Sequence, residues 1–385
     1  MKKLLHKRLN QVVDLAWRSV SRLGSAGDAR HRGTPLVSDD PSLCEELMRD
    51  MAAAEAVFQP TNYWQVYQER LMPLLRADGV RKFRASAAKV YGSFGMSQVP
   101  STLKYLPPFS LNGKTCETHP SDVINQFQRS LQAFYDMCFY SALQQDARIL
   151  EISDSGHGCP ADLFSPAVYP QNRYTLSFLR YFHHTLWVRK FVDFNKVRVL
   201  MELGSGYGGQ IEVLRKLFPH IHYVLCDIPP QVYVAEQYLK SVFPGEVTGY
   251  HETKAMDAVD LNKPAGITIL APWQLKKIKG SADFFWSATT FQEMEPEIVQ
   301  MYLDLVQPRV SRYIYLIQLP KGQHVAPRKG APGVLKPVTT ADYIRFLDRF
   351  SLLQEEQAVF FATGQQGIPY YEFNNHRHFL FGKKS

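Results

Sequence analysis

The distribution of apolar and polar residues changes near Val197. From there onward, short runs rich in β-branched and aromatic residues alternate with longer runs whose apolar positions recur at helical spacing. The runs expected to form strands cover residues 197–203, 222–228, 267–272, 283–289, 312–320, 352–361 and 377–383. The runs expected to form helices cover residues 209–218, 230–243, 295–307 and 340–350.

Strands that alternate with helices along a chain predict a parallel sheet with helices on both faces. The fold class expected here is therefore α/β, a doubly wound Rossmann-like sheet of seven strands. The last two strand candidates follow the final helix with only a loop between them, which predicts an antiparallel hairpin at one edge.

The chain before Val197 has the apolar spacing of helices rather than strands. Helices are expected over residues 42–58, with Asp40 as N-cap and Pro41 at the first position, and over residues 62–79, ending at Gly79. A third is expected over residues 121–145 with Ser121 as its cap. We therefore divide the chain into a basic helix and polar loop (1–40), a mainly helical region (41–195) and the sheet domain (196–385).

Residues 1–23 combine apolar positions at helical spacing with six lysines and arginines and one aspartate. This pattern predicts a basic amphipathic helix, which either lies on an anionic membrane surface or docks on its own protein or a second copy. Peripheral membrane contact and a homo-oligomer both remain open at this point.

Composition narrows the class of protein. The 385 residues, 45% of them hydrophobic, are enough for a large core, and no apolar run reaches the ~18–20 residues that span a bilayer. Five widely spaced cysteines without a CxxC pair fit a reducing cytoplasm, and no strong metal motif is present. The net charge of +8 favours anionic partners such as nucleic acid, anionic lipid or an acidic glycan.

A glycine-rich turn, "ELGSGYGG", connects the first strand candidate of the sheet domain to a helix. Gly204, Gly206 and Gly209 satisfy GxGxxG, a pattern that brings the backbone close to a ligand at the carboxyl edge of a sheet. Glu202 would repel a dinucleotide pyrophosphate but attract the ammonium and sulfonium of S-adenosylmethionine. Asp227 ends the second strand candidate, where a carboxylate accepts both ribose hydroxyls. These charges favour S-adenosylmethionine over NAD.

With these residues the chain resembles the class I S-adenosylmethionine-dependent methyltransferases. The segments "ELGSGYGGQ", "DIPPQVYVAEQYLKSVFP", "APWQL", "SATTFQEM" and "FRASAAKVYGSFG" are further similar to a family of sugar O-methyltransferases, over roughly residues 60–385. The resemblance implies S-adenosylmethionine as cofactor and places adenine near Trp273, whose alternative role is a core tryptophan. The cofactor-binding residues that it implies are Glu202, Gly204, Ser205, Gly206, Tyr207, Asp227, Ile228, Trp273 and Gln274.

The same resemblance places the end of the fourth strand beside the transferred methyl group, so Glu293 is a candidate general base for an acceptor hydroxyl. Its alternative role is a carboxylate in the first turn of a helix. His157, in the loop "EISDSGHGCPADLFSP", is a competing candidate because it titrates near neutrality, with Asp154 to orient it or to share a metal.

The expected reaction is methyl transfer from S-adenosylmethionine to a sugar hydroxyl of a bacterial glycan or glycosylated metabolite. Another small hydroxylated or amino metabolite, or a non-catalytic binding protein, are the alternatives. A nucleic-acid acceptor is not expected, because "DIPP" follows the second strand rather than the fourth. The basic, glycine- and proline-rich segment 319–337 either borders an anionic acceptor or is a solvated loop. The enzyme is expected in the cytoplasm, and in the first case the basic first helix would hold it near the inner face of the membrane.

Overall fold

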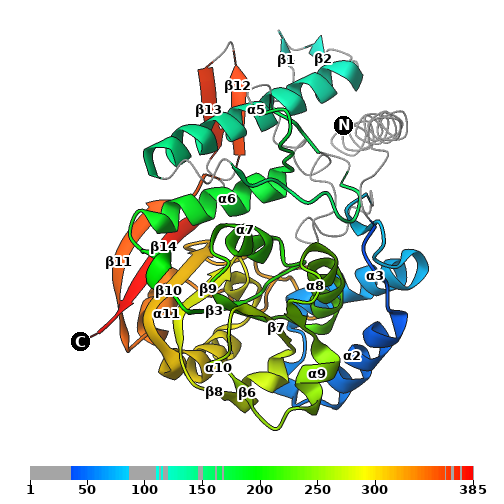
Figure 1. The fold of residues 1–385 in the computed structure, drawn as a ribbon, viewed down its shortest axis with the longest axis vertical. Helices are drawn as coiled ribbons and strands as arrows, with labels where there is room; N and C mark the ends of the chain where they lie inside the picture. Colours follow the sequence, from blue (N-terminus) through cyan, green and yellow to red (C-terminus); the bar gives the residue numbers. More distant parts are fainter. Residues whose placement is uncertain are drawn as a thin grey trace.

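The computed structural model describes residues 36–85, 110–111, 114–115, 120–145, 151–160, 163–166, 169–359, 361–365, 368–372 and 375–384. Its centre is an eight-stranded sheet with the order β11-β14-β10-β9-β3-β4-β7-β5 (Figure 1). These strands are β3 (Val199–Leu203), β4 (His222–Cys226), β5 (Val247–Thr248), β7 (Gly266–Leu270), β9 (Ala282–Ala288), β10 (Val310–Gln318), β11 (Phe350–Gln357) and β14 (Arg377–Lys383).

The topology confirms the doubly wound sheet. The strands from β10 to β5 run parallel to one another, and β14 is antiparallel to both β10 and β11. All seven predicted strands are present, and the predicted edge hairpin is the pair β11 and β14. The prediction of seven strands was wrong by one, because the two half-buried residues of β5 are too few to produce a strand pattern.

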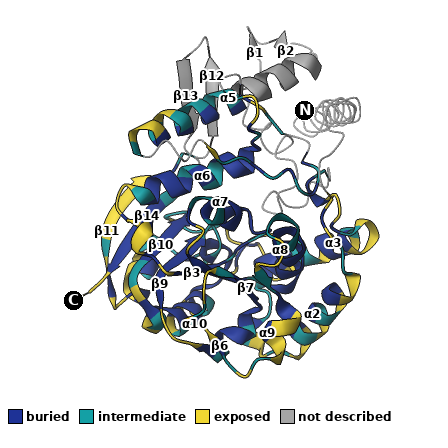
Figure 2. Ribbon diagram, in the orientation of Figure 1, coloured by how far each residue is buried: buried dark blue, intermediate teal, exposed yellow. Residues whose placement is uncertain are grey.

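Two hydrophobic cores lie on opposite faces of the sheet. On one face, side chains of the sheet pack against α6 (Leu176–Arg189), α7 (Gly209–Leu217) and α8 (Pro229–Val242). On the other face, they pack against α10 (Pro296–Val306) and α11 (Thr340–Phe346). Every residue of β3 and β4 is buried, as expected for strands covered on both faces (Figure 2).

The N-terminal helices α2 (Pro41–Ala53) and α3 (Asn62–Asp78) pack on the sheet domain and share its first core. Asp40 caps α2 through hydrogen bonds from the backbone N–H groups of Ser42 and Leu43, and Gly79 ends α3 at a φ of 61°, both as predicted. The contacts of α2 and α3 with α8 attach the start of the described chain to the sheet domain.

A second group of elements lies beyond α6 (Figure 1). The long helix α5 (Pro120–Gln145) packs against α6 and against the hairpin β12 (Phe361–Gln365) and β13 (Ile368–Glu372). Ser121 was predicted to cap α5 but lies inside its first turn, because the helix already begins at Pro120.

The remaining elements are short connections. They are β1 (Ser110–Leu111), β2 (Lys114–Thr115), β6 (Val259–Asp260), β8 (Ile278–Lys279) and α9 (Tyr250–Ala255). The predicted amphipathic helix over residues 1–23 lies outside the described residues. Among the helices that are described, none has the length and apolar character needed to cross a bilayer.

Candidate functional site

The glycine turn lies between β3 and α7, at the carboxyl edge of the sheet. Gly204, Gly206 and Gly208 have φ values of 83°, 56° and 87°, in the left-handed region that favours glycine. A Cβ atom on Gly204 would lie 1.7 Å from Oγ1 of Thr290, which follows β9. The turn is therefore packed directly against the end of β9, a contact that the sequence analysis did not predict.

Asp227 connects the glycine turn to the end of β4. Its Oδ2 accepts a hydrogen bond from the Gly206 backbone N–H at 2.8 Å, and its Oδ1 accepts one from the Ile228 N–H at 2.8 Å. Burial raises the pKa of the Asp227 carboxyl to about 7, although both hydrogen bonds favour the ionised form. Each oxygen retains a lone pair, so the carboxylate can also accept the hydroxyls of a ribose.

Glu202 lies on β3, two residues before the turn, and is 2% exposed. Its Oε2 atom is buried and has no hydrogen-bond partner. Burial, and then the neighbouring charge of Asp227, raise its pKa well above the usual range. A buried carboxylate without a partner is costly, and a cationic ligand relieves that cost. The pair of Glu202 and Asp227 thus fits S-adenosylmethionine, which carries an ammonium, a sulfonium and a ribose.

Two further residues predicted to bind the cofactor belong to the turn itself. Ser205 is buried, and its carbonyl accepts a hydrogen bond from the Gly208 N–H at 2.9 Å. The ring of Tyr207 packs into an aromatic group with Phe83 and Tyr238, at centroid distances of 5.7 and 5.1 Å. Tyr207 therefore presents its backbone, rather than its ring, at the turn.

Trp273 and Gln274 lie in the short helix η7 (Pro272–Lys277) that follows β7. The Trp273 ring is half-buried and meets the Tyr250 ring edge-on, at 6.2 Å between centroids. The Gln274 amide bonds within the protein at both ends: Oε1 accepts from the Ala271 N–H, and Nε2 donates to Thr253 Oγ1. Gln274 thus shapes the turn that carries Trp273.

Glu293 ends the short helix η8 (Phe291–Glu293), directly after β9 and the Thr290 contact. Its side chain is buried, and its Oε2 accepts a hydrogen bond from the Trp64 indole N–H at 2.9 Å. The Thr61 hydroxyl donates to the Glu293 backbone carbonyl, also at 2.9 Å. Thr61 is the N-cap of α3 and Trp64 lies in its first turn. Neither was predicted as a site residue, because Trp64 resembles a core residue and Thr61 resembles a helix cap.

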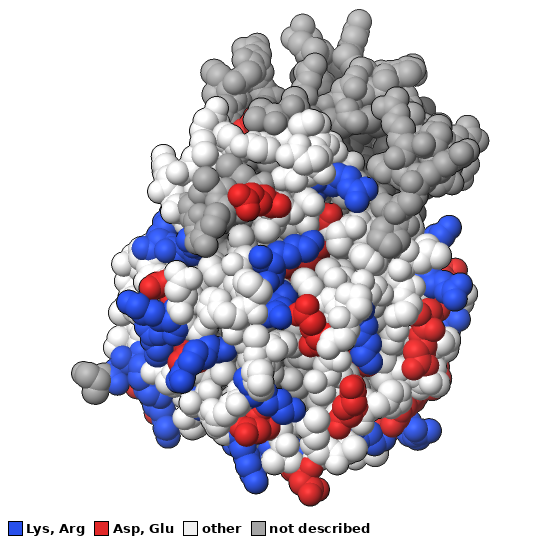
Figure 3. Space-filling model, viewed as in Figure 1, with Lys and Arg blue, Asp and Glu red and all other residues white. Residues whose placement is uncertain are grey.

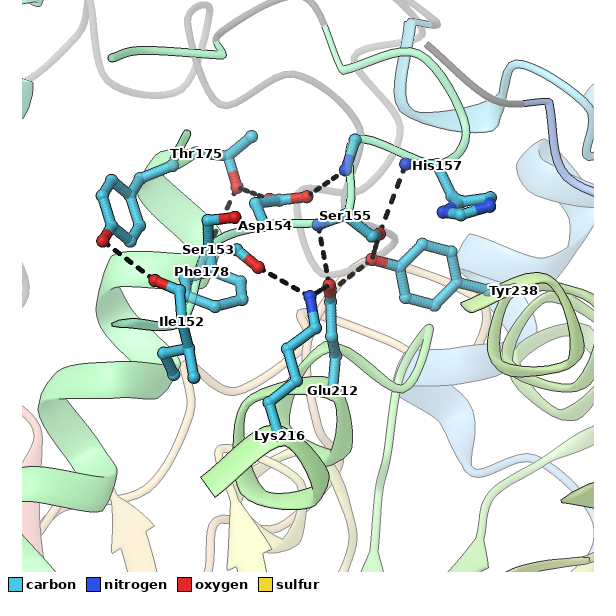
Figure 4. Close-up of polar contacts among 12 residues, drawn as sticks. Ile152, Ser153, Asp154, Ser155, His157, Thr175, Phe178, Glu212, Lys216 and Tyr238 are labelled. Carbon is cyan, nitrogen blue, oxygen red and sulfur yellow. Dashed lines mark hydrogen bonds and ion pairs between the residues drawn. The ribbon is translucent and has the colours of Figure 1, made fainter. Parts of the chain in front are cut away.

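The second candidate base, His157, has other neighbours. In Figure 4 the loop that carries Asp154, Ser155 and His157 lies over Glu212 and Lys216 of α7. Nδ1 of His157 is buried without a hydrogen-bond partner. Burial lowers the pKa of this histidine, so its neutral form is favoured.

Asp154 was predicted to orient His157 or to share a metal with it, and the structure contradicts this. Its carboxylate forms a bidentate ion pair with the buried Arg84, at 2.8 and 2.6 Å, and also accepts from the Thr175 hydroxyl and the Gly156 N–H. Burial opposes ionisation, but Arg84 and these hydrogen bonds outweigh it and lower the pKa of Asp154 to about 2. The partner of the Asp154 carboxylate is thus an arginine outside the loop, and the two residues come together only in the folded chain.

The ion pair belongs to a buried network that fixes this loop. Arg84 also donates to Tyr238 on α8 and lies over the Tyr207 ring, 5.4 Å from its centroid. Glu212 on α7 accepts hydrogen bonds from the Ser155 N–H at 2.8 Å and from Lys216 at 2.6 Å. The loop is therefore connected to α7, to α8 and, through Tyr207, to the glycine turn.

Four histidines gather where α6 meets β14, but they do not form a metal site. The His378 ring stacks on Trp187 at 4.5 Å, and its Nδ1 shares a hydrogen bond with the Tyr315 hydroxyl at 2.6 Å. Burial lowers the pKa of His184 and His378, which favours neutral rings. In the part of the chain that the structure describes, no group of three or more histidine, cysteine, aspartate or glutamate residues is arranged to hold a metal.

The affinity for the cofactor product should depend on pH through Asp227. Because its carboxyl ionises near pH 7 and the ribose hydroxyls donate to the ionised form, the affinity for S-adenosylhomocysteine should fall below pH 7, by up to about tenfold per pH unit. Calorimetry between pH 5.5 and 8 measures this. Asp227→Asn should bind more weakly and with a flatter pH dependence. An affinity of the wild-type protein that is constant across this range would contradict the assignment.

Comparison with known proteins agrees with this geometry. The model of an O-methyltransferase domain family matches residues 125–259, which include the glycine turn and Asp227. No curated protein matches the chain significantly.

Several solved structures are similar to parts of this chain at low identity. Magnesium protoporphyrin IX methyltransferase from Synechocystis PCC 6803 with bound S-adenosylhomocysteine is 13% identical, over 65% of this chain and 97% of that chain, with a TM-score of 0.35. The same enzyme with bound S-adenosylmethionine is 16% identical, over 48% and 69% of the two chains, with a TM-score of 0.30. The pyocyanin biosynthetic protein PhzM is 14% identical, over 68% and 72%, with a TM-score of 0.35.

The sheet order, the glycine turn with its two carboxylates, and the family model that covers this turn all indicate the same chemistry. A buried carboxylate with an unpartnered oxygen beside the turn fits a cationic cofactor rather than a dinucleotide. The protein is an S-adenosylmethionine-dependent methyltransferase, with S-adenosylmethionine as its cofactor.

Proposed function

We propose that the protein transfers the methyl group to a hydroxyl of a sugar, with Glu293 as the general base. The observation that carries the proposal is the position of Glu293, buried at the end of β9 next to the Thr290 contact with the cofactor turn. His157 is the less favoured base, because its loop bonds to α7 and α8 rather than to the end of β9.

The start of α3 supports a sugar as the acceptor. Trp64 and Tyr67 form an aromatic pair with 6.2 Å between their ring centroids, beside Glu293. Gln68 follows Tyr67 in the chain, and its Oε1 atom is buried and has no hydrogen-bond partner. Aromatic rings next to amide groups suit sugars, whose ring faces are apolar and whose hydroxyls need hydrogen bonds. We therefore assign the acceptor side to the region 41–195.

In this mechanism the protein holds both reactants in line. Glu202 would neutralise the ammonium of the cofactor, Asp227 would accept the ribose hydroxyls, and Trp273 would contact adenine. Bound S-adenosylmethionine supplies the methyl group on its sulfonium. Glu293 accepts the proton of the attacking hydroxyl, and positioning supplies much of the rate enhancement.

Formation of S-adenosylhomocysteine in the presence of candidate acceptors tests the proposal. Matched sets of sugars, glycosylated metabolites, phenols and amines should be compared at equal concentration. The proposal expects the sugar set to give the fastest turnover. Faster turnover of phenols or amines would instead support the alternative, a methyltransferase of another small hydroxylated or amino metabolite.

We further propose that the acceptor sugar is anionic, because of the loop after β10. Lys321, Arg328, Lys329 and Lys336 are exposed on it, and Asn62 at the start of α3 holds it through bonds to Gly330, Ala331 and Gly333. This anchoring connects the basic loop to the helix that carries Trp64, and the Leu335 N–H of the loop donates to Glu295, two residues after Glu293. Figure 3 shows one face of the molecule, on which basic and acidic side chains are interspersed, so a local cluster matters more than the net charge.

The charge of Lys329 should then affect substrate binding. Lys329→Glu should raise the Michaelis constant of an acidic sugar by several-fold and leave that of its neutral counterpart unchanged. Added salt should reduce the difference, because exposed charges are screened over ~8 Å at physiological ionic strength. Lys279→Glu, an exposed lysine in β8, serves as the charge-matched control. Equal Michaelis constants for the acidic sugar in both variants would contradict an anionic acceptor.

A further inference from the structure

The contact between Trp64 and Glu293 joins two segments that lie far apart in the chain. The indole N–H donates to Oε2 of the carboxylate at 2.9 Å, in a buried environment and across 229 residues of sequence. Trp64 is 8% exposed and Glu293 is 7% exposed. Burial by itself opposes ionisation of a carboxyl group, whereas a hydrogen bond from a neutral donor favours the ionised form, and this bond is electrostatically stronger in a buried site.

The start of α3 holds the indole in place. The Thr61 hydroxyl donates to the Glu293 backbone carbonyl, and the buried Asn62 side chain bonds to the loop after β10 through three hydrogen bonds. Trp64 also packs edge-on against Tyr63, with 6.2 Å between the ring centroids. The Trp64–Glu293 contact is therefore held by a second hydrogen bond between the same two segments and by the attachment of α3 to the loop after β10, which is the kind of support that a preorganised group requires.

We propose that Trp64 is a positioning residue, whose indole N–H holds the Glu293 carboxylate ionised and aimed for proton transfer from the acceptor hydroxyl. The inference rests on the proposed function, in which Glu293 is the base. In that step the acceptor O–CH₃ bond forms as the C–S bond breaks. The electron pair of the broken bond remains on sulfur, and the hydroxyl proton moves to Glu293. Trp64 contributes by keeping the carboxylate ready to receive this proton in a buried site.

The effect of Trp64 on the ionisation of Glu293 must be distinguished from the effects of other polar and ionisable groups. Glu295 lies two residues away, and its Oε1 accepts a hydrogen bond from the Leu335 N–H at 3.0 Å. On the other side, Gln292 bonds to His376 at 3.2 Å. The basic loop after β10 contributes Lys329 and Lys336, which are exposed and therefore screened.

The experiment compares two tryptophan variants. Trp64→Phe removes the indole N–H next to Glu293. Trp187→Phe removes the same kind of bond elsewhere, because the Trp187 indole donates to Glu356 on β11 at 2.5 Å. Both variants lose a buried indole, so a change that is specific to Trp64→Phe cannot come from lost packing alone.

The first readout needs no acceptor. In protein labelled with ¹³C at the glutamate carboxyl carbons, Glu293→Gln identifies the Glu293 signal, and the signal is then titrated. Trp64→Phe should raise the titration midpoint of Glu293 by about one to two pH units, the equivalent of a lost charge-assisted hydrogen bond. Trp187→Phe should leave the midpoint unchanged. An unchanged midpoint in Trp64→Phe would overturn the inference.

The second readout is activity with the best acceptor from the screen. The acid limb of the pH–rate profile should move to higher pH in Trp64→Phe, with the affinity for S-adenosylhomocysteine unchanged. If Glu293→Gln abolishes transfer but Trp64→Phe keeps the wild-type profile, the role of Trp64 is refuted and the base assignment stands. If Glu293→Gln does not slow transfer, the proposed base is refuted and the inference falls with it.

Discussion

Glu293→Gln is expected to slow single-turnover methyl transfer by ~10²–10⁴-fold, the usual effect of removing a general base. Glutamine keeps the size of the side chain and can still accept the hydrogen bond from Trp64, but its amide cannot take up the proton of the acceptor hydroxyl. The affinity for S-adenosylhomocysteine should be unchanged, because the cofactor is held by Glu202, the glycine turn and Asp227. Rapid-quench kinetics with cofactor affinity measured in parallel separates the two effects.

His157→Gln is the matched comparison for this prediction. His157 lies among residues of the loop and α7, so its replacement should slow transfer by less than tenfold. If His157→Gln instead slows methyl transfer strongly and Glu293→Gln has a near-normal rate, His157 is the base. If neither replacement slows transfer tenfold, both candidates are wrong.

Asp154→Ala is expected to lower the free energy of unfolding by about 3–5 kcal/mol, the largest effect on stability that we predict. The substitution leaves the Arg84 guanidinium, which is 0% exposed, without its bidentate partner in the interior. Thr175 and the Gly156 N–H lose their acceptor as well. Denaturant unfolding at pH 7 measures the change.

Glu45→Gln provides the control for an ion pair at the surface. The Glu45–Arg76 bridge is more than half exposed, so its loss should cost less than about 1 kcal/mol. The wild-type stabilisation from Asp154 should also depend on pH. The folded-state pKa of Asp154 is about 2, below the ordinary value of about 4 for aspartate, so this stabilisation is complete above pH 4 and is lost as the pH falls towards 2. If both substitutions lower the free energy of unfolding by the same amount, the buried Arg84–Asp154 pair stabilises the protein no more than a surface ion pair does.

Local sequence patterns predicted the frame of the fold because each pattern depends on neighbours in the chain. Apolar runs bounded by turn residues gave all seven expected strands, and β3 and β4 are buried throughout. Asp40 and Gly79 act as predicted at the ends of α2 and α3, since capping involves residues within one turn of a helix. The missed elements include β5, which has two residues, the hairpin β12–β13 and the short elements β1, β2, β6, β8 and α9.

The glycine turn could be predicted from the sequence for the same reason. The order Glu202, Gly204 and Asp227 places two carboxylates around a glycine turn once the two strands are parallel neighbours. The doubly wound pattern guarantees that arrangement. What the pattern did not reveal is the cost of burying Glu202 and Asp227, which depends on the helices and loops packed over them.

The partners of the catalytic candidates could not be predicted in this way. Asp154 appeared to be close enough in sequence to serve His157, but Arg84, 70 residues away, takes its carboxylate. A buried charge pairs with the opposite charge that the folded chain brings nearest, and sequence proximity does not determine which one that is.

The sequence by itself determined the α/β sheet and the glycine turn, because short-range periodicity and the order of strands encode them. It also determined the class of cofactor, because the charges of Glu202 and Asp227 around the turn distinguish a cationic ligand from a dinucleotide. Only the tertiary structure decided that α3 meets the end of β9, where Trp64 bonds to Glu293 across 229 residues. That contact forms because the first core holds α3 and α8 together with the sheet, and packing between distant segments leaves no local pattern in the chain.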